Sequence, residues 1–259
     1  MYAWPTVNFP VDYWPWIADY SKFIHPTLKK HIPNFLTCGN LFCGCVGIVS
    51  VFQNDLVFAA YMIGLAALLD FADGFVARIM NAYSLIGKDL DSLADCVTFG
   101  VLPSMMLYKL LQKSLMGDGF AIEIFVVLPY LAFLIAIFSA LRLAKFNTDT
   151  RQSESFIGVP TPANALLVGS LPLIMWQHPD WMHYIQNPYA LIGYILLTSY
   201  LLVSELPLFA LKFKNFSLAN NRIRYIFLSI SLVLLIWLRF AAVPPIILLY
   251  ILLSFVRRR

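Results

Sequence analysis

Eight long apolar segments, separated by short polar connections, limit what this chain can fold into. They cover roughly residues 34–53, 55–80, 89–112, 120–145, 161–177, 188–207, 222–240 and 241–256. A helix needs about 20 mainly apolar residues to cross the hydrocarbon core of a bilayer, and backbone in lipid has to satisfy its own hydrogen bonds. The chain is 60% hydrophobic and 12% charged, about half the charged fraction of a soluble domain. We therefore predict an all-α integral membrane protein with eight transmembrane helices.

No long linker, low-complexity tract or internal repeat divides the apolar segments in the sequence. We therefore predict a single transmembrane catalytic domain over residues 34–259. The preceding residues 1–33 contain Trp4, Trp14 and Trp16, and they lack the pattern of a secretory signal. Indole rings settle at the boundary between headgroups and hydrocarbon. We expect residues 1–33 to form an interfacial segment.

The basic residues predict which helix ends face the cytoplasm. If the N-terminus is inside, 15 of the 18 Lys and Arg residues lie on the cytoplasmic side, and only Lys109, Lys113 and Arg239 lie outside. An excess of Lys and Arg in cytoplasmic loops is the usual orientation signal. We therefore predict a multi-pass protein of the cell (inner) membrane with both termini inside. The net charge of +4 then reflects topology, so no nucleic-acid partner is predicted.

Five of the 14 acidic residues fall between residues 70 and 95, where the second and third apolar segments meet. Asp70 and Asp73 are three residues apart, and Asp91 and Asp95 are four apart, so each pair projects from one helix face. Four carboxylates at one membrane boundary would repel each other strongly without compensation. Divalent Mg²⁺, Mn²⁺ or Ca²⁺ prefer oxygen ligands and would relieve that repulsion. We predict a two-metal site at the cytoplasmic boundary.

Small and basic residues beside the carboxylates suggest a substrate. Gly74 and Ala77 remove side-chain bulk from one helix, and Gly87 removes it from the facing turn, so a large group can approach the backbone. Arg78 lies one turn beyond Gly74 and offers a planar set of donors that matches phosphate oxygens. These features favour a pyrophosphate-bearing substrate. The alternative is structural: the carboxylates pair with Arg78 and Lys88, although four acids exceed two cations.

The acidic region also has a defined spacing. It reads Asp-Gly-x₂-Ala-Arg-x₈-Gly-x₃-Asp-x₃-Asp from Asp73 to Asp95, with Asp70 three residues before it. This pattern resembles the signature of the CDP-alcohol phosphotransferases. The resemblance implies a six-helix membrane core that binds a CDP-linked donor at the cytoplasmic boundary, often in a homodimer. Eight predicted helices exceed that core by two, so we expect the extra pair at the C-terminal end.

Flanking stretches narrow the resemblance. Residues 33–41, 90–103, 141–147 and 156–162 are similar to the membrane-embedded phosphatidylserine synthases, and with the core motif the similarity covers roughly residues 30–170. The resemblance implies that a phosphatidyl group is transferred from CDP-diacylglycerol to the hydroxyl of L-serine, with CMP as the second product. Alternatives are another acceptor, such as glycerol-3-phosphate, choline or inositol, and an archaeal ether-lipid donor.

The resemblance also implies roles for individual residues. Asp70, Asp73 and Asp91 are expected to hold two divalent metals, Mg²⁺ or Mn²⁺. Asp95 is expected to share the second metal and to accept the proton of the attacking hydroxyl as the catalytic general base. The residues expected at the CDP-diacylglycerol site are Gly74, Ala77, Arg78, Gly87, Asn34 and Thr37.

Several polar residues outside the core motif keep two interpretations. Two roles are possible for Asn34, Thr37 and Asn40: they can bind the cytidine of the donor, or they can cap the start of a helix. Arg142 and Lys145 lie one turn apart, where they can receive the serine carboxylate or anchor a helix end at the interface.

A different class of function remains open. Acidic residues within a membrane also occur in cation and proton transporters. A transporter needs acids near mid-membrane and a path to both sides, whereas this cluster lies at one predicted boundary.

Overall fold

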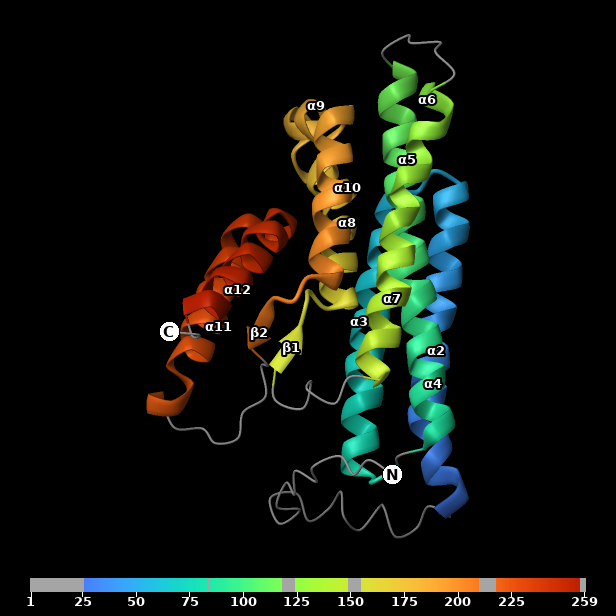
Figure 1. Ribbon diagram of the computed structural model, residues 1–259, viewed down its shortest axis with the longest axis vertical. Helices are drawn as coiled ribbons and strands as arrows, with labels where there is room; N and C mark the ends of the chain where they lie inside the picture. The colour runs from blue at the N-terminus through green and yellow to red at the C-terminus, as the bar shows by residue number, and fades with distance from the viewer. Residues whose placement is uncertain (1–25, 83, 118–123, 149–154, 210–217, 257–259) are drawn as a thin grey trace.

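The computed structural model describes residues 26–82, 84–117, 124–148, 155–209 and 218–256. Within these ranges the chain is almost entirely helical (Figure 1). The helices run in chain order as follows: α2 (Pro26–Phe52), α3 (Leu56–Ile79), α4 (Leu85–Asp95), the π-helix η2 (Cys96–Val101), α5 (Leu102–Gly117), α6 (Ile124–Val127), η3 (Leu128–Phe133), α7 (Leu134–Thr148), α8 (Thr161–Gln177), η5 (Pro179–Trp181), α9 (Met182–Ile185), α10 (Pro188–Val203), α11 (Leu218–Leu238), η6 (Arg239–Ala242) and α12 (Val243–Val256).

The predicted fold class, an all-α membrane protein, is confirmed. Each of the eight predicted segments overlaps one helix or several consecutive helical elements. Five stretches are long and apolar enough to cross a membrane: His31–Phe52, Leu56–Ile79, Ile86–Leu115, Leu128–Thr148 and Asn221–Phe255. The last stretch contains two helices, because η6 reverses the chain between α11 and α12. Residues 1–25 of the predicted interfacial segment lie outside the described residues.

Two helices begin earlier than the sequence predicted. α2 begins at Pro26 and accommodates Pro33 in its interior, where the Pro33 carbonyl oxygen lies 3.1 Å from the Thr37 hydroxyl oxygen. α4 begins at Leu85 because the Ser84 hydroxyl caps it and accepts from the Gly87 N–H over 2.9 Å. A side-chain cap of this kind satisfies a backbone donor at the helix start. The acidic pairs therefore lie within continuous helices.

The segment after α10 differs from the prediction. The helix ends at Val203 instead of residue 207, and β2 (Pro207–Phe209) pairs antiparallel with β1 (Ser155–Ile157). Gly158 follows β1 with a φ of +75°, and a Cβ there would lie 2.6 Å from the Leu202 carbonyl oxygen. Strands of three residues are too short to show an alternating pattern. This ladder ties the start of α8 to the end of α10.

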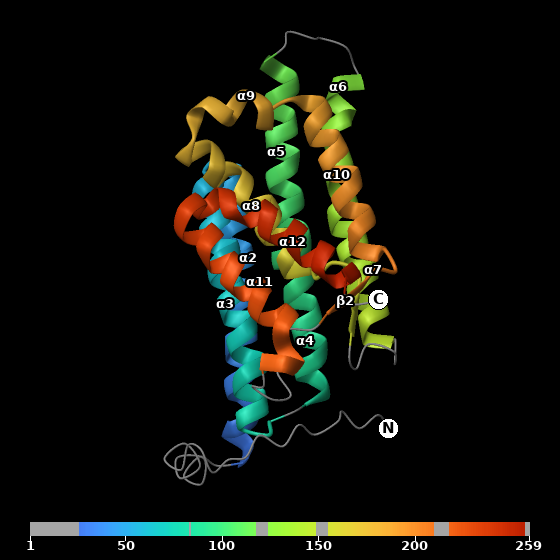
Figure 2. The same cartoon turned by 90° about the vertical axis from the view of Figure 1, so that its left-hand side faces the viewer.

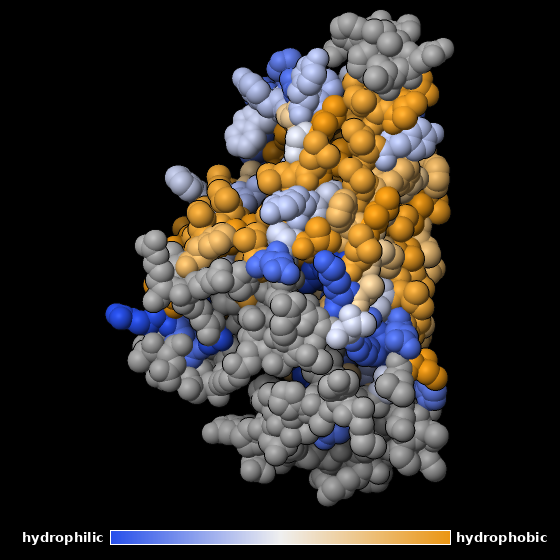
Figure 3. Space-filling model, in the orientation of Figure 1, coloured by the Kyte–Doolittle hydropathy of each residue, from blue (hydrophilic) through white to orange (hydrophobic). Residues whose placement is uncertain are grey.

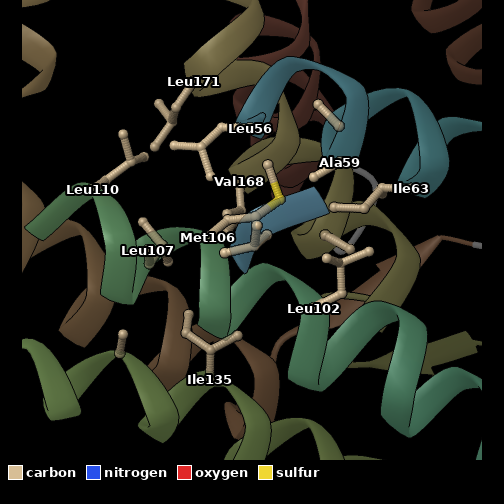
Figure 4. Packing of buried hydrophobic residues seen from close by; sticks show 14 of the residues in the cluster. Leu56, Ala59, Ile63, Leu102, Met106, Leu107, Leu110, Ile135, Val168 and Leu171 are labelled. Atoms are coloured by element: carbon tan, nitrogen blue, oxygen red, sulfur yellow. The ribbon is translucent and has the colours of Figure 1, made fainter. Parts of the chain in front are cut away.

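The centre of the bundle is packed by α3, α5, α7 and α8 (Figure 4). Ile63, Leu102 and Met106 are fully buried there. Ala60 and Gly169 let α3 and α8 approach closely, since a Cβ on Gly169 would lie 3.7 Å from the Ala60 Cβ. In lipid, burying apolar side chains gains little from water exclusion, so close packing between small residues has to stabilise the helix pairs.

The outer surface fits a lipid environment. Phe35, Phe42 and Trp237 are 77%, 67% and 83% exposed. Figure 3 shows hydrophobic residues over most of the long helices at its right-hand side, and hydrophilic residues toward the end where α4 begins and α7 ends. The end of the bundle that carries the acidic motif is therefore a polar end, although hydrophilic residues also lie at the opposite end in Figure 3.

The C-terminal helices α11 and α12 form a hairpin that packs against α8 (Figure 2). The turn between them is fixed by Gln177 at the end of α8. Its side-chain amide donates to the Leu238 carbonyl over 3.3 Å, and its oxygen accepts from the Phe240 N–H over 3.2 Å. The two predicted C-terminal segments, 222–240 and 241–256, therefore meet in a short turn at η6.

Candidate active site

Three acidic side chains converge between α3 and α4. Carboxylate oxygens of Asp70, Asp91 and Asp95 all lie within 4.8 Å of one another. Asp70 comes from α3, whereas Asp91 and Asp95 come from α4, and α2 packs against both helices. Asp95 is only 8% exposed. The structure thus brings three of the four predicted metal ligands into one small volume.

Asp73 lies beside this group with a different partner. Its Oδ2 accepts a hydrogen bond from the Thr37 hydroxyl over 2.6 Å, and its side chain is 7% exposed. It remains close enough to Asp70, Asp91 and Asp95 to interact electrostatically with each. Thr37 therefore fixes the orientation of the fourth predicted ligand.

Asp95 is held by α2 in a similar way. The Asn40 side-chain amide donates to Asp95 Oδ1 over 3.2 Å, and Asn40 is fully buried. The Asn40 carbonyl in turn accepts from the Thr98 hydroxyl over 3.2 Å. A buried amide that donates to a carboxylate stabilises its charged form and fixes its rotamer. This role of Asn40 was not predicted.

Capping is the wrong interpretation for the polar residues of α2. The helix begins at Pro26, so Asn34, Thr37 and Asn40 lie well inside it. The three are spaced three residues apart and recur on one face of an otherwise apolar helix. Polar groups inside a membrane helix usually face a functional interior. This spacing was a signal that the face meets a polar interior, where Thr37 and Asn40 contact carboxylates and Asn34 lies beside Gly87.

The acidic group fits a divalent cation. Asp91 Oδ1 is buried and has no hydrogen-bond partner within the described part of the chain. A magnesium ion binds oxygen at about 2.0–2.1 Å, so oxygens on opposite sides of one ion are about 4 Å apart. The separations of up to 4.8 Å between the three carboxylates are close to that requirement. These residues can therefore hold a divalent metal.

The basic residues near the carboxylates do not neutralise them by direct pairing. The Arg78 Nε donates to the Gly74 carbonyl over 2.8 Å, and the Lys88 Nζ donates to the Asn147 carbonyl over 3.2 Å. Both donors therefore reach backbone oxygens instead of acids. The structural alternative in which Arg78 and Lys88 pair with the acids is not what the described side chains show. Cations from solution explain better how the negative charges of the clustered aspartates are compensated.

The last turns of α3, which follow Asp73 in the sequence, contain Gly74, Ala77 and Arg78. Arg78 is exposed, and its guanidinium lies beside Gly74. Packing within the chain explains why position 87 is a glycine: a Cβ there would lie 2.9 Å from the Asn34 side-chain oxygen. Gly87 thus allows α2 and α4 to approach each other. The binding roles predicted for these residues stay predictions.

Asn147 connects α7 to α4. The backbone carbonyl of Asn147 accepts a hydrogen bond from the Lys88 Nζ, and its side-chain Nδ2 donates one to the Ser92 hydroxyl over 2.8 Å. Lys88 also places a positive charge at the C-terminal end of α7, where the helix dipole favours it. These bonds hold the end of α7 against the helix that carries Asp91 and Asp95. The sequence analysis included Asn147 in a similar stretch and gave it no role.

The two cations predicted to bind serine lie in different surroundings. Arg142 on α7 is 7% exposed and close enough to Asp95 to interact electrostatically. Lys145, one turn further along α7, is exposed. Only Arg142 therefore lies in the protein interior beside the carboxylates.

A π-helical segment follows Asp95 directly. In η2, Thr98, Phe99 and Gly100 are buried, and the segment packs against α2 and α7. Short π-helical stretches inside longer helices occur frequently at functional sites. The segment redirects the helix between the carboxylates and α5. No pattern in the sequence predicted it.

Comparison with known proteins identifies the family. The family model for CDP-alcohol phosphatidyltransferase matches residues 30–237, which include every residue named in the acidic motif. The chain belongs to the CDP-alcohol phosphatidyltransferase family. The family predicted from the motif is thereby confirmed. The match ends within α11, so α12 lies beyond the part of this phosphatidyltransferase that the family model describes.

Individual members of the family are similar over much of the chain. The CDP-diacylglycerol--serine O-phosphatidyltransferase of Helicobacter pylori is 31% identical over 211 residues, covering 80% of this chain and 81% of the relative. The enzyme of the same name from Bacillus subtilis is 40% identical over 133 residues, covering 51% of this chain and 70% of the relative. The archaetidylserine synthase of Methanothermobacter thermautotrophicus is 30% identical over 144 residues, covering 55% and 58%.

Proposed function

We propose that this chain transfers the phosphatidyl group of CDP-diacylglycerol to the hydroxyl of L-serine and releases CMP. The observation that carries the proposal is the convergence of Asp70, Asp91 and Asp95 between α3 and α4. The choice of serine is supported by the relatives from Helicobacter pylori and Bacillus subtilis, whose names specify CDP-diacylglycerol and serine. It is also supported by Arg142, the one buried cation among the described residues, because a phosphate-bearing acceptor would need more positive charge.

Metal binding belongs to the same proposal. Asp70, Asp91 and Asp95 would hold one divalent cation, and Asp73 would join Asp70 and Asp91 around a second, with Mg²⁺ or Mn²⁺ as the ions. When bound, such cations neutralise and polarise a pyrophosphate. Thr37 and Asn40 contribute by fixing the carboxylates of Asp73 and Asp95 through the hydrogen bonds described above.

The donor site is proposed at the end of α3 and the start of α4. The guanidinium of Arg78 is exposed and anchored by Gly74, so its remaining N–H groups can reach phosphate oxygens. Gly74 and Ala77 present little side-chain bulk toward the same region. Asn34 and Gly87 touch one another across α2 and α4, next to where the cytidine would enter, and Thr37 lies one turn above Asn34.

Asp95 is the proposed general base. In the reaction, a bond forms between the serine hydroxyl oxygen and the phosphorus that bears diacylglycerol, and the bond from that phosphorus to the CMP oxygen breaks. The proton of the hydroxyl moves to Asp95, whose carboxylate is oriented by Asn40. Arg142 is placed to receive the serine carboxylate, because it lies close to Asp95 in the protein interior. Lys145 would attract serine from the surface.

The proposal includes an orientation in the membrane. The acidic motif would face the cytoplasm of a cell (inner) membrane, with both termini on the same side. It is supported by the distribution of 15 of the 18 basic residues and by the hydrophilic end of the bundle in Figure 3. A homodimer is proposed from the family resemblance.

One assay tests the acceptor. Purified protein is incubated with CDP-diacylglycerol, Mg²⁺ or Mn²⁺, and labelled serine, glycerol-3-phosphate, choline or inositol, and the lipid product is identified. We expect phosphatidylserine and CMP in equal amounts, with product from serine only. A labelled lipid from another alcohol, or no transfer to any of them, would contradict the proposal. A parallel reaction with an ether-linked CDP donor tests the donor alternative.

A further inference from the structure

A cavity lies at the end of α3 that is opposite to the acidic motif. This distal cavity, which Asp55 and Lys113 line, has a volume of about 240 Å³, and its walls come from the α2–α3 turn, α5, α8 and α9. Asp55, the residue before α3, precedes Asp73 by 18 residues. A helix rises about 1.5 Å per residue, so this separation is about 27 Å along the helix axis. That length is close to the thickness of the hydrocarbon core, so the cavity lies near the other membrane boundary (Figure 1).

Apolar side chains form much of the lining of the distal cavity. Leu56, Leu110 and Met175 are buried, whereas Trp176 and Met182 are 63% and 42% exposed. An indole ring settles where headgroups meet hydrocarbon, so Trp176 and Met182 offer an apolar surface to lipid chains at that level. The lining therefore combines buried apolar residues with an apolar edge that a lipid can reach.

Two opposite charges and an amide complete the lining. Asp55 Oδ1 accepts from the Phe58 N–H over 2.9 Å and caps α3, which leaves its second carboxylate oxygen for a ligand. The Lys113 ammonium has no hydrogen-bond or ion-pair partner among the described residues. Gln186 is tied to α5, because its backbone carbonyl accepts a hydrogen bond from the Ser114 hydroxyl. The cavity therefore presents a carboxylate and an ammonium that are not paired with each other.

We propose that the distal cavity binds the headgroup of a zwitterionic phospholipid with a primary ammonium, phosphatidylethanolamine. Its phosphate contacts the Lys113 ammonium, and its own ammonium donates to the Asp55 carboxylate. Its acyl chains pass over Trp176 into the bilayer. The distal cavity is separate from the carboxylates of the acidic motif, so this inference does not depend on the proposed function.

Volume and charge select this headgroup. Sites that enclose a whole small-molecule ligand have volumes of about 300–1,000 Å³, so a cavity of about 240 Å³ suits a headgroup without its chains. One ammonium and one carboxylate complement a headgroup of zero net charge, whereas an anionic headgroup would place a like charge beside Asp55. A choline headgroup has no N–H group, so it cannot donate a hydrogen bond to that carboxylate.

The test uses purified full-length protein that has been freed of lipid in a neutral detergent. Phosphatidylethanolamine, phosphatidylcholine and phosphatidylglycerol with identical acyl chains are each added, and native mass spectrometry measures the bound lipid. We expect the wild type to bind phosphatidylethanolamine about three- to fivefold more tightly than either other lipid, the upper range for an exposed charge pair. Soluble phosphoethanolamine should not compete at the same concentration, because it lacks the acyl chains that contact Trp176.

Two variants separate the two charges of the distal cavity. Asp55→Asn keeps an oxygen that caps α3 and removes the charge, so phosphatidylethanolamine should bind only as tightly as phosphatidylcholine. Lys113→Gln should weaken the binding of both lipids alike, by about three- to fivefold, since both carry a phosphate. Lys109→Gln is the matched control, because Lys109 lies one turn earlier on α5 and outside the cavity lining. It should change neither affinity.

Three results would overturn the inference. Equal binding of the three lipids by the wild type, or a preference for phosphatidylglycerol, would show that the cavity does not select a zwitterionic headgroup. A preference for phosphatidylethanolamine over phosphatidylcholine that survives in Asp55→Asn would remove this carboxylate from the site. Equal losses in Lys109→Gln and Lys113→Gln would indicate a general effect of charge. Because Lys113 is exposed, the Lys113→Gln measurement decides the question even if Asp55→Asn fails to fold.

Discussion

The two sides of the candidate site differ in how their polar groups are satisfied. On the donor side, Thr37 and Asn40 of α2 bind Asp73 and Asp95 directly. On the acceptor side, Arg142 and Asn164 each carry a buried nitrogen with no hydrogen-bond partner in the described chain. The comparison indicates that the carboxylates of Asp73 and Asp95 are held in place before any ligand binds, whereas Asp91 Oδ1 has no partner in the described chain. The acceptor side instead completes its hydrogen bonds when a small polar molecule arrives.

This difference leads to a kinetic expectation. Changes on the donor side should lower kcat or metal affinity, because the groups there act on the reacting phosphorus. Changes on the acceptor side should raise the KM for serine, because the groups there act on binding. The following four predictions test this separation, from the largest expected effect to the smallest.

Asp91→Asn should reduce transfer at least about a thousandfold, since it removes a charge that stabilises cations at the reacting centre. Asp91 Oδ1 is the buried carboxylate oxygen with no partner in the described chain. The rate is measured as CMP release, with membrane insertion checked in parallel. Asp89→Asn is the matched control, because Asp89 is exposed on the same helix. Normal turnover by Asp91→Asn would remove this residue from the metal site.

Asp95→Asn should lower kcat about a hundredfold, because the amide cannot accept the hydroxyl proton. The affinity for CDP-diacylglycerol, measured by equilibrium binding at saturating Mg²⁺, should fall much less than the rate, because Asp70, Asp73 and Asp91 remain to hold cations. Retention of donor binding with loss of rate is the signature of a base. A fall in donor affinity as large as the fall in rate would argue instead for a role in binding.

Arg142→Ala should raise the KM for serine by about ten- to a hundredfold, the range for losing a hydrogen bond to a charged group. The KM for CDP-diacylglycerol should change much less. Lys145→Ala should have a smaller effect on the serine KM, because Lys145 is exposed whereas Arg142 is buried. Equal effects of Arg142→Ala on both substrates would place Arg142 outside the acceptor side.

Thr37→Val should weaken metal affinity about tenfold, since partners of metal ligands typically contribute this much. Valine keeps the shape of threonine and removes the hydroxyl that donates to Asp73. The measurement is the Mn²⁺ concentration that gives half-maximal rate. Thr37→Ser keeps the hydroxyl and should behave like the wild type. If the two variants need the same Mn²⁺ concentration for half-maximal rate, the hydrogen bond to Asp73 does not contribute to metal affinity.

The sequence predicted the parts of the molecule that depend on spacing along one helix. Each apolar segment is long enough to identify by composition, and the three- and four-residue spacing places Asp70 with Asp73 and Asp91 with Asp95. The resemblance supplied the family, and the comparisons confirmed it. The predicted roles of the individual site residues remain to be tested.

The contacts between helices could not be predicted in the same way. The bonds from Thr37 and Asn40 to Asp73 and Asp95 join residues 36 and 55 positions apart. Spacing shows that α2 has a polar face, but it does not show which helices that face meets. The three-residue strands were missed because they are too short to alternate.

The central claim is that the carboxylates of α3 and α4 together bind divalent metal ions. Electron paramagnetic resonance of Mn²⁺ tests it directly, by counting bound ions in purified wild-type protein, Asp91→Asn and the control Asp89→Asn. The account predicts saturable Mn²⁺ binding by the wild type and the control, and affinity at least about tenfold weaker in Asp91→Asn. Equal Mn²⁺ binding by all three proteins would contradict it.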